Sequence, residues 1–150
     1  MATVNPILRI FDYAKALELY IDWLGFRIDW EHRPDGSPGY LQITRDDVTL
    51  HLSEHHGDCC PGSTVFVWMA GIDEFHREIM SKGYKYLRPG IETTFYGSKS
   101  VQVIDPFGNR IRFNESREQG SESCPPRCAR TAGSRVHRAR PGPDATRTRT

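Results

Sequence analysis

The feature that most constrains the fold of this chain is an internal repeat with an offset of roughly 60 residues. Gly25-Phe26, at the end of one helix-type segment, corresponds to Gly83-Tyr84 at the end of another. The tight turn Asp46-Asp47 corresponds in the same way to Phe107-Gly108. Each helix-type segment follows one short β-rich run and precedes three more, so the repeating unit is βαβββ. The sequence therefore predicts an α+β protein made of two such units.

Both helices are predicted from their ends and their apolar spacing. In residues 12–25, Asp12 is the expected N-cap and Gly25 lies just past the end. The apolar stripe of this helix consists of Ala14, Leu17, Ile21 and Leu24. In residues 72–83, Asp73 is the expected cap and Gly83 ends the helix. Its buried face is predicted to consist of Ile72, Phe75 and Ile79.

Eight runs have the β-branched and aromatic character of strands. In the first unit they are residues 7–11, 26–31, 40–44 and 48–52. In the second they are residues 64–69, 84–87, 100–104 and 110–113. A four-stranded sheet with one covering helix leaves its other face bare, so two units are expected to pair their sheets into a cupped surface. Small-molecule sites commonly form in such concavities.

The composition changes sharply after residue 116. Residues 1–116 hold 12 basic and 16 acidic side chains, a net charge of −4, and form the predicted domain. Residues 117–150 hold eight Arg against three acidic residues, and their only large aliphatic side chain is Val136. Such a segment buries too little apolar surface to fold, so a disordered basic tail is expected. It has no aromatic ring to stack on bases, which disfavours nucleic acid as a partner. The acidic body suits a cationic ligand, although solubility alone explains its charge equally well.

The sequence also bears on location and redox state. It has no uninterrupted apolar run of about 18 residues and no basic-then-apolar N-terminal segment, so a cytoplasmic protein without a membrane partner is expected. Cys59 and Cys60 are adjacent, and Cys124 and Cys128 fall in the tail, so reduced thiols are expected. A reactive or metal-binding pair at Cys59-Cys60 is the alternative.

Residues 6–115 resemble the vicinal oxygen chelate superfamily, which includes glyoxalase I, extradiol dioxygenases and bleomycin-resistance proteins. The general marks are the stretches FDYAKALELYIDWLGF and DPFGNRIRF. Similarity to the bleomycin-binding branch is carried by PILRIFD, RDDVTL, VFVWMAGIDEF and the loop of residues 92–97. The resemblance implies paired βαβββ modules, a homodimer with a first strand crossing to the partner at Pro6, and no cofactor. It implies sequestration of a glycopeptide drug, with or without its metal, rather than catalysis.

The resemblance also indicates which side chains would form the drug-binding groove. A flat drug with a cationic tail needs aromatic faces near carboxylates. The ligand-binding residues predicted on this basis are Trp30, Tyr40, Phe66, Trp68, Tyr96 and Gly97. Phe66 and Trp68 alternate with Val65 and Val67 and so share one strand face. Glu31, Asp35 and Asp58 are the expected acidic neighbours. For any single ring, a place in the core is the competing interpretation.

The alternative function is that of a metal-dependent glyoxalase- or dioxygenase-like enzyme. The positions that resemble the superfamily's metal ligands are Asn5, His51, Thr64 or Val65, and Arg112. Only His51 is a good donor, and a guanidinium neither coordinates a cation nor tolerates one nearby. A weaker possibility is a site made by His51, Glu54 and His55, which would need a turn after Ser53 to bring its members together. These observations favour a binding protein without catalytic residues or metal.

Overall fold

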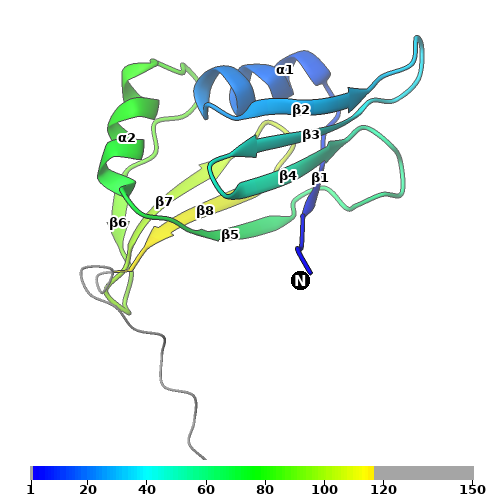
Figure 1. Cartoon of the computed structure of the whole chain (residues 1–150). Helices are drawn as coiled ribbons and strands as arrows, with labels where there is room; N and C mark the ends of the chain where they lie inside the picture. The colour runs from blue at the N-terminus through cyan, green and yellow to red at the C-terminus, as the bar shows by residue number, and fades with distance from the viewer. Residues whose placement is uncertain (1, 117–150) are drawn as a thin grey trace, which may run out of the picture.

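The computed structural model describes residues 2–116. Within this range two βαβββ modules follow one another, which confirms the predicted α+β architecture (Figure 1). The predicted boundary after residue 116 and the predicted disordered tail concern residues 117–150, which lie outside the described residues.

The first module contains one helical segment and four strands. Strand β1 (Ile7–Arg9) is followed by helix α1 (Tyr13–Leu17), which continues directly into a π-helical segment, η1 (Glu18–Trp23). Strands β2 (Arg27–His32), β3 (Tyr40–Arg45) and β4 (Val48–Ser53) complete the module. The sheet order is β1-β4-β3-β2, with β1 parallel to β4 and the other pairs antiparallel.

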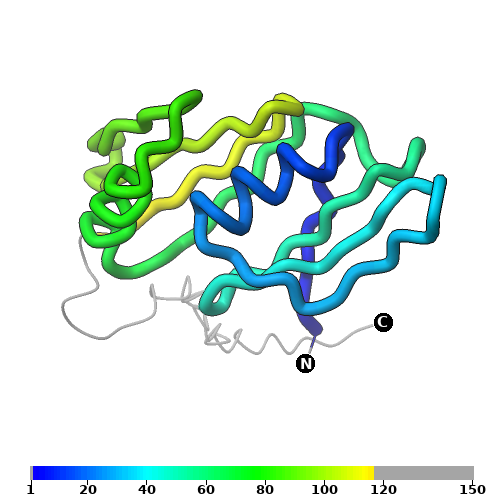
Figure 2. The backbone as a smooth tube through the Cα atoms, turned by 90° about the horizontal axis from the view of Figure 1, so that it is seen from above, coloured from blue at the N-terminus to red at the C-terminus, as the bar shows by residue number. Residues whose placement is uncertain are grey.

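The second module repeats this topology. It consists of β5 (Thr64–Trp68), α2 (Ile72–Ser81), β6 (Ile91–Thr93), β7 (Lys99–Ile104) and β8 (Arg110–Glu115). Its sheet order is β5-β8-β7-β6, again with only the first pair parallel. Seen from above, the two modules lie side by side (Figure 2). The two sheets are separate four-stranded sheets within the chain.

The first helix begins where the sequence predicts and buries a wider face than the predicted stripe. The Asp12 carboxylate accepts a hydrogen bond from the backbone N–H of Lys15 at 3.0 Å, as an N-cap does. Of the predicted stripe only Leu24 is fully buried, and Ala14 is exposed. The fully buried side chains of the segment are Ala16, Leu19, Tyr20, Trp23 and Leu24. Leu17 and Ile21 are partly buried against the core, so the predicted stripe is wrong only at Ala14. The buried face is wider than predicted because the segment packs against both modules and its second half is wound as a π-helix.

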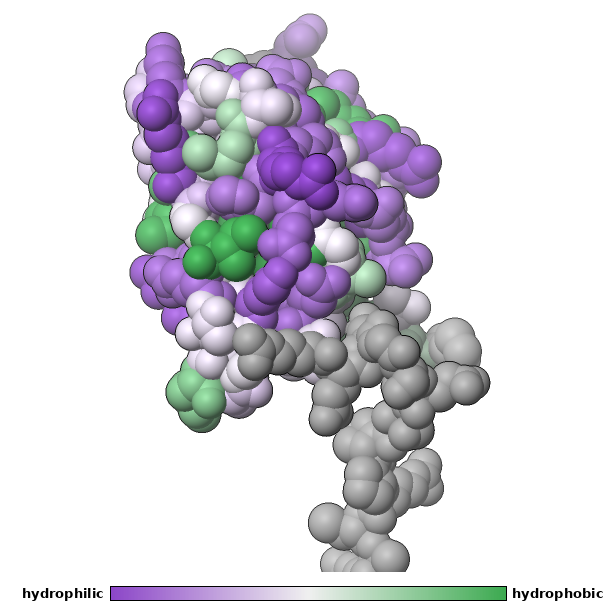
Figure 3. Space-filling view, turned by 90° about the vertical axis from the view of Figure 1, so that its left-hand side faces the viewer, coloured by the Kyte–Doolittle hydropathy of each residue, from purple (hydrophilic) through white to green (hydrophobic). Residues whose placement is uncertain are grey.

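Helix α2 buries the predicted face, but its cap is not the predicted one. Ile72, Phe75 and Ile79 are all buried. The N-cap position is Gly71, and Glu115 at the end of β8 accepts hydrogen bonds from the N–H groups of Gly71 and Ile72 at 2.6 and 3.4 Å. Asp73 lies inside the first turn and pairs with Lys99. The side of the molecule that carries α2 is mostly hydrophilic, with separate hydrophobic areas (Figure 3).

The strand predicted at residues 84–87 is also wrong. These residues are a turn, and the edge strand is β6, a few residues later. Tyr84 follows the end of α2 and stacks on Trp23, with ring centroids 4.7 Å apart. Tyr86 packs edge to face against Tyr84. The aromatic alternation that suggested a strand therefore comes from ring packing beside the first module.

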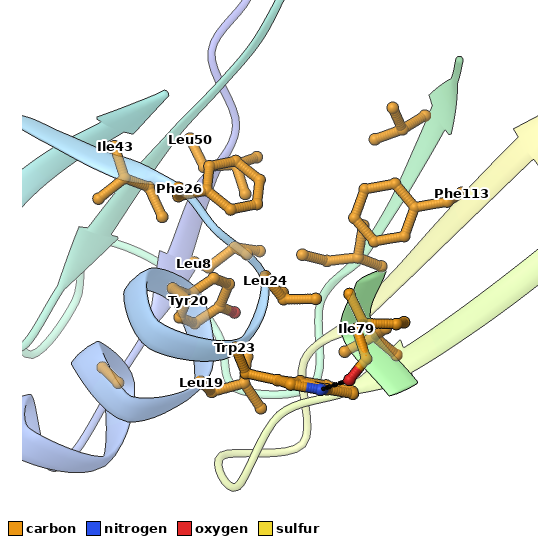
Figure 4. Packing of buried hydrophobic residues seen from close by; sticks show 14 of the residues in the cluster. Leu8, Leu19, Tyr20, Trp23, Leu24, Phe26, Ile43, Leu50, Ile79 and Phe113 are labelled. Atoms are coloured by element: carbon orange, nitrogen blue, oxygen red, sulfur yellow. Dashed lines mark hydrogen bonds between the residues drawn. The ribbon is translucent and has the colours of Figure 1, made fainter. Parts of the chain in front are cut away.

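The two modules share one hydrophobic core, formed where the helix-bearing sides of their sheets meet (Figure 4). Trp23 donates its indole N–H to the carbonyl of Ile79 at 2.7 Å, drawn as a dashed line in Figure 4. The buried hydroxyl of Tyr20 donates to Asp105 at 2.8 Å, and burial is the main cause that raises the pKa of this aspartate. The helices and core thus cover one face of each sheet and leave the other face open. Within residues 2–116 no helix has the length and apolarity needed to cross a membrane.

Candidate ligand-binding surfaces

The open face of the first sheet follows from side-chain alternation. Along β3, Leu41 and Ile43 are fully buried in the core, whereas Tyr40, Gln42 and Thr44 are only partly buried and lie on the opposite face. His51 of β4 lies on the same face as Gln42, its partner in the ladder between β3 and β4. We call this surface, with Trp30 and Asp29 of β2, the first open face.

An irregularity in β2 brings a carboxylate onto this face. The pairing register shifts between Ile28 and Trp30, as in a β-bulge, so Asp29 is an additional residue on its strand. Its carboxylate accepts hydrogen bonds from Gln42, at 2.9 Å, and from Thr44. The bond from Gln42 is the largest cause that lowers the pKa of Asp29, so this group is ionised at neutral pH. Sequence reasoning missed Asp29, because nothing in a single run of residues shows where a bulge will fall.

Two of the predicted groove residues form a stacked pair on the first open face. The rings of Trp30 and Tyr40 lie 5.8 Å apart and nearly parallel, at 12°. His51 meets both rings edge-on, and its Nδ1 is 2.7 Å from the Tyr40 hydroxyl. Burial raises the pKa of Tyr40, with smaller contributions from Asp58 and Cys59. The tyrosine is therefore a neutral hydrogen-bonding group beside a flat aromatic surface.

The open face of the second sheet carries the other predicted strand aromatics. Phe66 and Trp68 have exposed fractions of 46% and 55%, and their ring centroids are 5.0 Å apart. Val67 between them is buried, so the predicted shared face is confirmed. Arg112 is paired with Phe66 across the ladder and is exposed on the same face. We call this surface the second open face.

The last two predicted residues lie on the turn between β6 and β7. Gly97 has a φ of 82°, a left-handed conformation that glycine adopts without strain. Its N–H bonds to the Thr94 carbonyl at 2.9 Å, and the Thr94 N–H bonds to the Ser98 carbonyl at 2.8 Å. This fixed turn presents Phe95, which is fully exposed, and Tyr96, which is half exposed. The two rings meet nearly perpendicularly at 4.9 Å.

The structure thus places the six predicted residues in three groups. Trp30 and Tyr40 lie together, as do Phe66 and Trp68, and Tyr96 is adjacent to Gly97. Among residues 2–116, no ring contact joins one group to another. A single chain therefore presents separate aromatic surfaces rather than one closed groove.

The three carboxylates expected near the groove do not lie together in the structure. Glu31 accepts a hydrogen bond from the Tyr13 hydroxyl, and Asp58 accepts one from the Ser53 hydroxyl at 2.5 Å. Asp35 is exposed in the loop between β2 and β3. Asp58 is the carboxylate whose charge contributes to the raised pKa of Tyr40. Asp29 lies on the same face as Tyr40 through its bonds to Gln42 and Thr44, and it also pairs with Arg27 at 3.3 Å.

The donor set does not fit the divalent metal of the superfamily's enzymes. His51 and Arg112 lie on the open faces of different sheets, and His51 Nδ1 is already engaged by Tyr40. The weaker candidate also fails to assemble, because the Glu54 carboxylate accepts the N–H of Gly39 at 2.8 Å. Nowhere in the described part of the chain do three His, Cys, Asp or Glu side chains gather as metal ligands would.

Two βαβββ modules, each with a four-stranded mixed sheet and one open sheet face, define the class of this fold. A family model described as glyoxalase superfamily protein matches residues 1–120. The chain belongs to this superfamily.

Known proteins support the same assignment. The chain is 25% identical over 126 residues to the bleomycin resistance protein of Geobacillus stearothermophilus, covering 72% of this chain and 92% of that protein. A crystal structure of a bleomycin-binding protein complexed with bleomycin superposes with a TM-score of 0.61 at 22% identity, covering 77% of this chain and 99% of that one. An antibiotic binding protein from Streptomyces gives 0.59 at 19% identity, with coverage of 77% and 96%. At these identities the solved structures establish the fold.

Proposed function

We propose that this protein binds a flat, cationic glycopeptide drug of the bleomycin class and sequesters it without chemical change, whether or not the drug carries its metal. The observation that carries the proposal is the pair of ring-bearing open faces, one of which holds an ionised carboxylate. Trp30 and Tyr40 offer a flat aromatic surface on the sheet face that also carries Asp29. Phe66 and Trp68 offer a second one. The similarity to the Geobacillus bleomycin resistance protein supports the same ligand class.

The chemistry of these surfaces suits such a ligand. Stacking on each aromatic ring contributes about 0.5 to 1.5 kcal/mol beyond burial. A cation close to a ring adds about 0.5 to 2 kcal/mol. The net charge of −4 on residues 1–116 attracts a cation over a longer range. The Nε2 atom of His51 and the Nη1 atom of Arg9 are buried without a hydrogen-bond partner among the described residues. Nη1 of Arg9 is a donor for a ligand acceptor, whereas Nε2 of His51 donates or accepts according to its tautomer.

We further propose that two chains form the binding groove together. Within one chain the two ring pairs lie apart. In the proposed dimer, the second open face of one chain lies over the first open face of its partner, so that the groove has one ring pair on each side. A two-fold axis then makes two equivalent grooves. Residues 2–5 lie outside β1, with Val4 exposed by 89%, and Pro6 immediately precedes the strand. This segment is the proposed arm that reaches the partner, with Tyr96 and Gly97 at the rim.

The enzyme alternative gains no support from the geometry. Arg112 stands where a carboxylate ligand would be needed, and the histidines nearest to His51 do not join it at a common point. A cytoplasmic location stays a prediction from the sequence.

The test is a titration of intrinsic tryptophan fluorescence with metal-free and with copper-loaded bleomycin. We expect saturation at one drug per chain, and mass spectrometry should recover the drug unchanged. Tyr96→Ala should weaken binding about 5- to 150-fold, which corresponds to about 1 to 3 kcal/mol for a ring that acts as an interface anchor. Tyr86→Ala is the matched control, because Tyr86 is also exposed but lies outside the three groups.

Two results would refute this function. The first is an unquenched signal at drug concentrations far above micromolar. The second is equal loss of affinity in Tyr96→Ala and Tyr86→Ala, because it would show that the effect is not local to the groove.

A further inference from the structure

A cleft between the two modules is not used by the proposed groove. Its volume is about 250 Å³. Phe26 and Val48 line it from the first module, and Phe75 and Phe113 line it from the second. In Figure 4 the rings of Phe26 and Phe113 face one another across this gap, with Leu24 lying below. All three phenylalanines are almost completely buried, so they form an apolar floor.

The mouth of the cleft is acidic. It is bordered by the turn between β3 and β4, which carries Asp46 and Asp47. The carboxylate of Asp47 makes no hydrogen bond or ion pair with any residue from 2 to 116. Asp46 is 84% exposed and has only a 3.7 Å contact with Arg45. The free charge at the mouth is therefore negative.

The cation at the mouth, Arg45, is already engaged by other groups of the chain. Arg45 donates two hydrogen bonds to Glu78, at 2.7 and 3.2 Å, and a third to the Leu24 carbonyl. Its guanidinium also lies over the Phe75 ring at 4.9 Å. Lys82, on the same side, is paired with Glu78 at 3.1 Å. Because Arg45 is held in this way, it does not offer a site for an anion, and Asp47 has no cation to neutralise it.

We infer that this cleft binds a small organic ammonium group with an aromatic or branched hydrocarbon body. An apolar cavity of about 150 Å³ accommodates a benzene-sized molecule, so the cleft has room for one ring and a short side chain. The hydrocarbon lies against the three phenylalanines and the ammonium lies at the mouth beside Asp47. The site belongs to one chain and does not require the dimer. Trp68 lines both the cleft and the second open face, so the group bound there is either a free amine or the cationic end of a larger ligand.

The experiment is a titration of the full chain with benzylammonium, followed by NMR of ¹³C-labelled phenylalanine rings. We expect saturable shifts at one site per chain, and weaker binding of benzyl alcohol, which has a similar shape but no charge. Asp47→Asn should weaken benzylammonium binding about two- to fivefold, as expected for a partly exposed ion pair. Asp22→Asn, which removes an exposed carboxylate that does not line the cleft, should leave it unchanged.

A blocking variant locates the site independently. Ala70 is exposed at the mouth, so Ala70→Phe should fill the entrance without disturbing the core, which circular dichroism will verify. Loss of benzylammonium binding in this variant supports the cleft, and retained affinity overturns it. Equal binding of benzyl alcohol, or of the Asp47→Asn variant, overturns the recognition of charge. Displacement of benzylammonium by bleomycin identifies the cationic tail of the drug as the natural occupant of the cleft. Simultaneous binding of both identifies a site for a separate amine. The binding of benzylammonium tests the cleft even if the proposal for the groove fails.

Discussion

Replacing Trp23 by Phe tests whether the contact between the modules stabilises the fold. The indole N–H donates to the carbonyl of Ile79, one of the last four carbonyls of α2 and therefore without a partner inside the helix. Trp23→Phe leaves that buried carbonyl unsatisfied, which costs about 1 to 3 kcal/mol. The smaller ring leaves a void of about 40 Å³, which adds about 1 kcal/mol.

The expected loss in the free energy of unfolding is therefore about 2 to 4 kcal/mol, measured by urea denaturation. The matched control is Trp30→Phe, since Trp30 is 45% exposed and makes no hydrogen bond through its indole in residues 2–116. A change within about 0.5 kcal/mol is typical of such surface positions. If the two variants lose equal stability, the bridge between Trp23 and α2 does not hold the modules together, and the shared core must be reconsidered.

Three further predictions follow from other contacts. Arg45 lowers the pKa of Glu78 by hydrogen bonding, so their contribution to stability should be complete above the ordinary glutamate pKa of about 4.3 and disappear as the pH falls through the lowered value. Urea midpoints of wild type and Glu78→Gln should therefore differ at pH 7, and the difference should shrink as the pH falls below about 4. A difference that stays constant down to the acid end of the series would contradict this. Glu115→Gln should cost about 1 kcal/mol in thermal unfolding by weakening the α2 cap, with no effect expected if solvent caps the helix equally well. Light scattering at micromolar concentration should give twice the 17.2 kDa mass of the chain, and a clean monomer would rule out the shared groove.

The repeat in the sequence was enough to predict most of the fold. Seven of the eight predicted strands and both helices lie where their patterns indicate, because strand alternation and helix ends are written in neighbouring residues. The exception shows the limit of that information. All three residues of strand β6 are exposed, and their side chains show no alternation of buried and exposed positions. Tyr84 and Tyr86 alternate in sequence because their rings pack on Trp23 and on each other, and not because they form a strand.

The errors in the predicted helix cap and helix face both arise from contacts between residues that are distant in the sequence. The acceptor that caps α2 is Glu115, separated from Gly71 by 44 residues, and no local pattern predicts that contact. Asp73 has a suitable capping side chain but lies two residues beyond the N-cap, where Lys99 is its partner. At the first helix, the change to π-helical winding turns Tyr20 and Trp23 toward the second module.

At the candidate site, the sequence predicted the ring-bearing residues but not their distribution. The alternation of Phe66 and Trp68 was sufficient to place both on one face. The position of Asp29 required the bulge in β2, and the separation of the ring pairs required knowledge of how the modules pack. Both depend on contacts between strands rather than on the order of residues along one strand.

The packing of the modules explains why the proposed site needs two chains. Each sheet has one apolar face, and the two apolar faces are already covered by the shared core and the helices. The remaining faces carry half-exposed rings, including Trp30, Phe66 and Trp68, which a single chain leaves in water. In an isologous pair, the first open face of each chain meets the second open face of the other, so one symmetric contact covers both surfaces at once. Two grooves result, and the expected stoichiometry is two drugs per dimer, which calorimetry would distinguish from a single ligand bound across the two-fold axis.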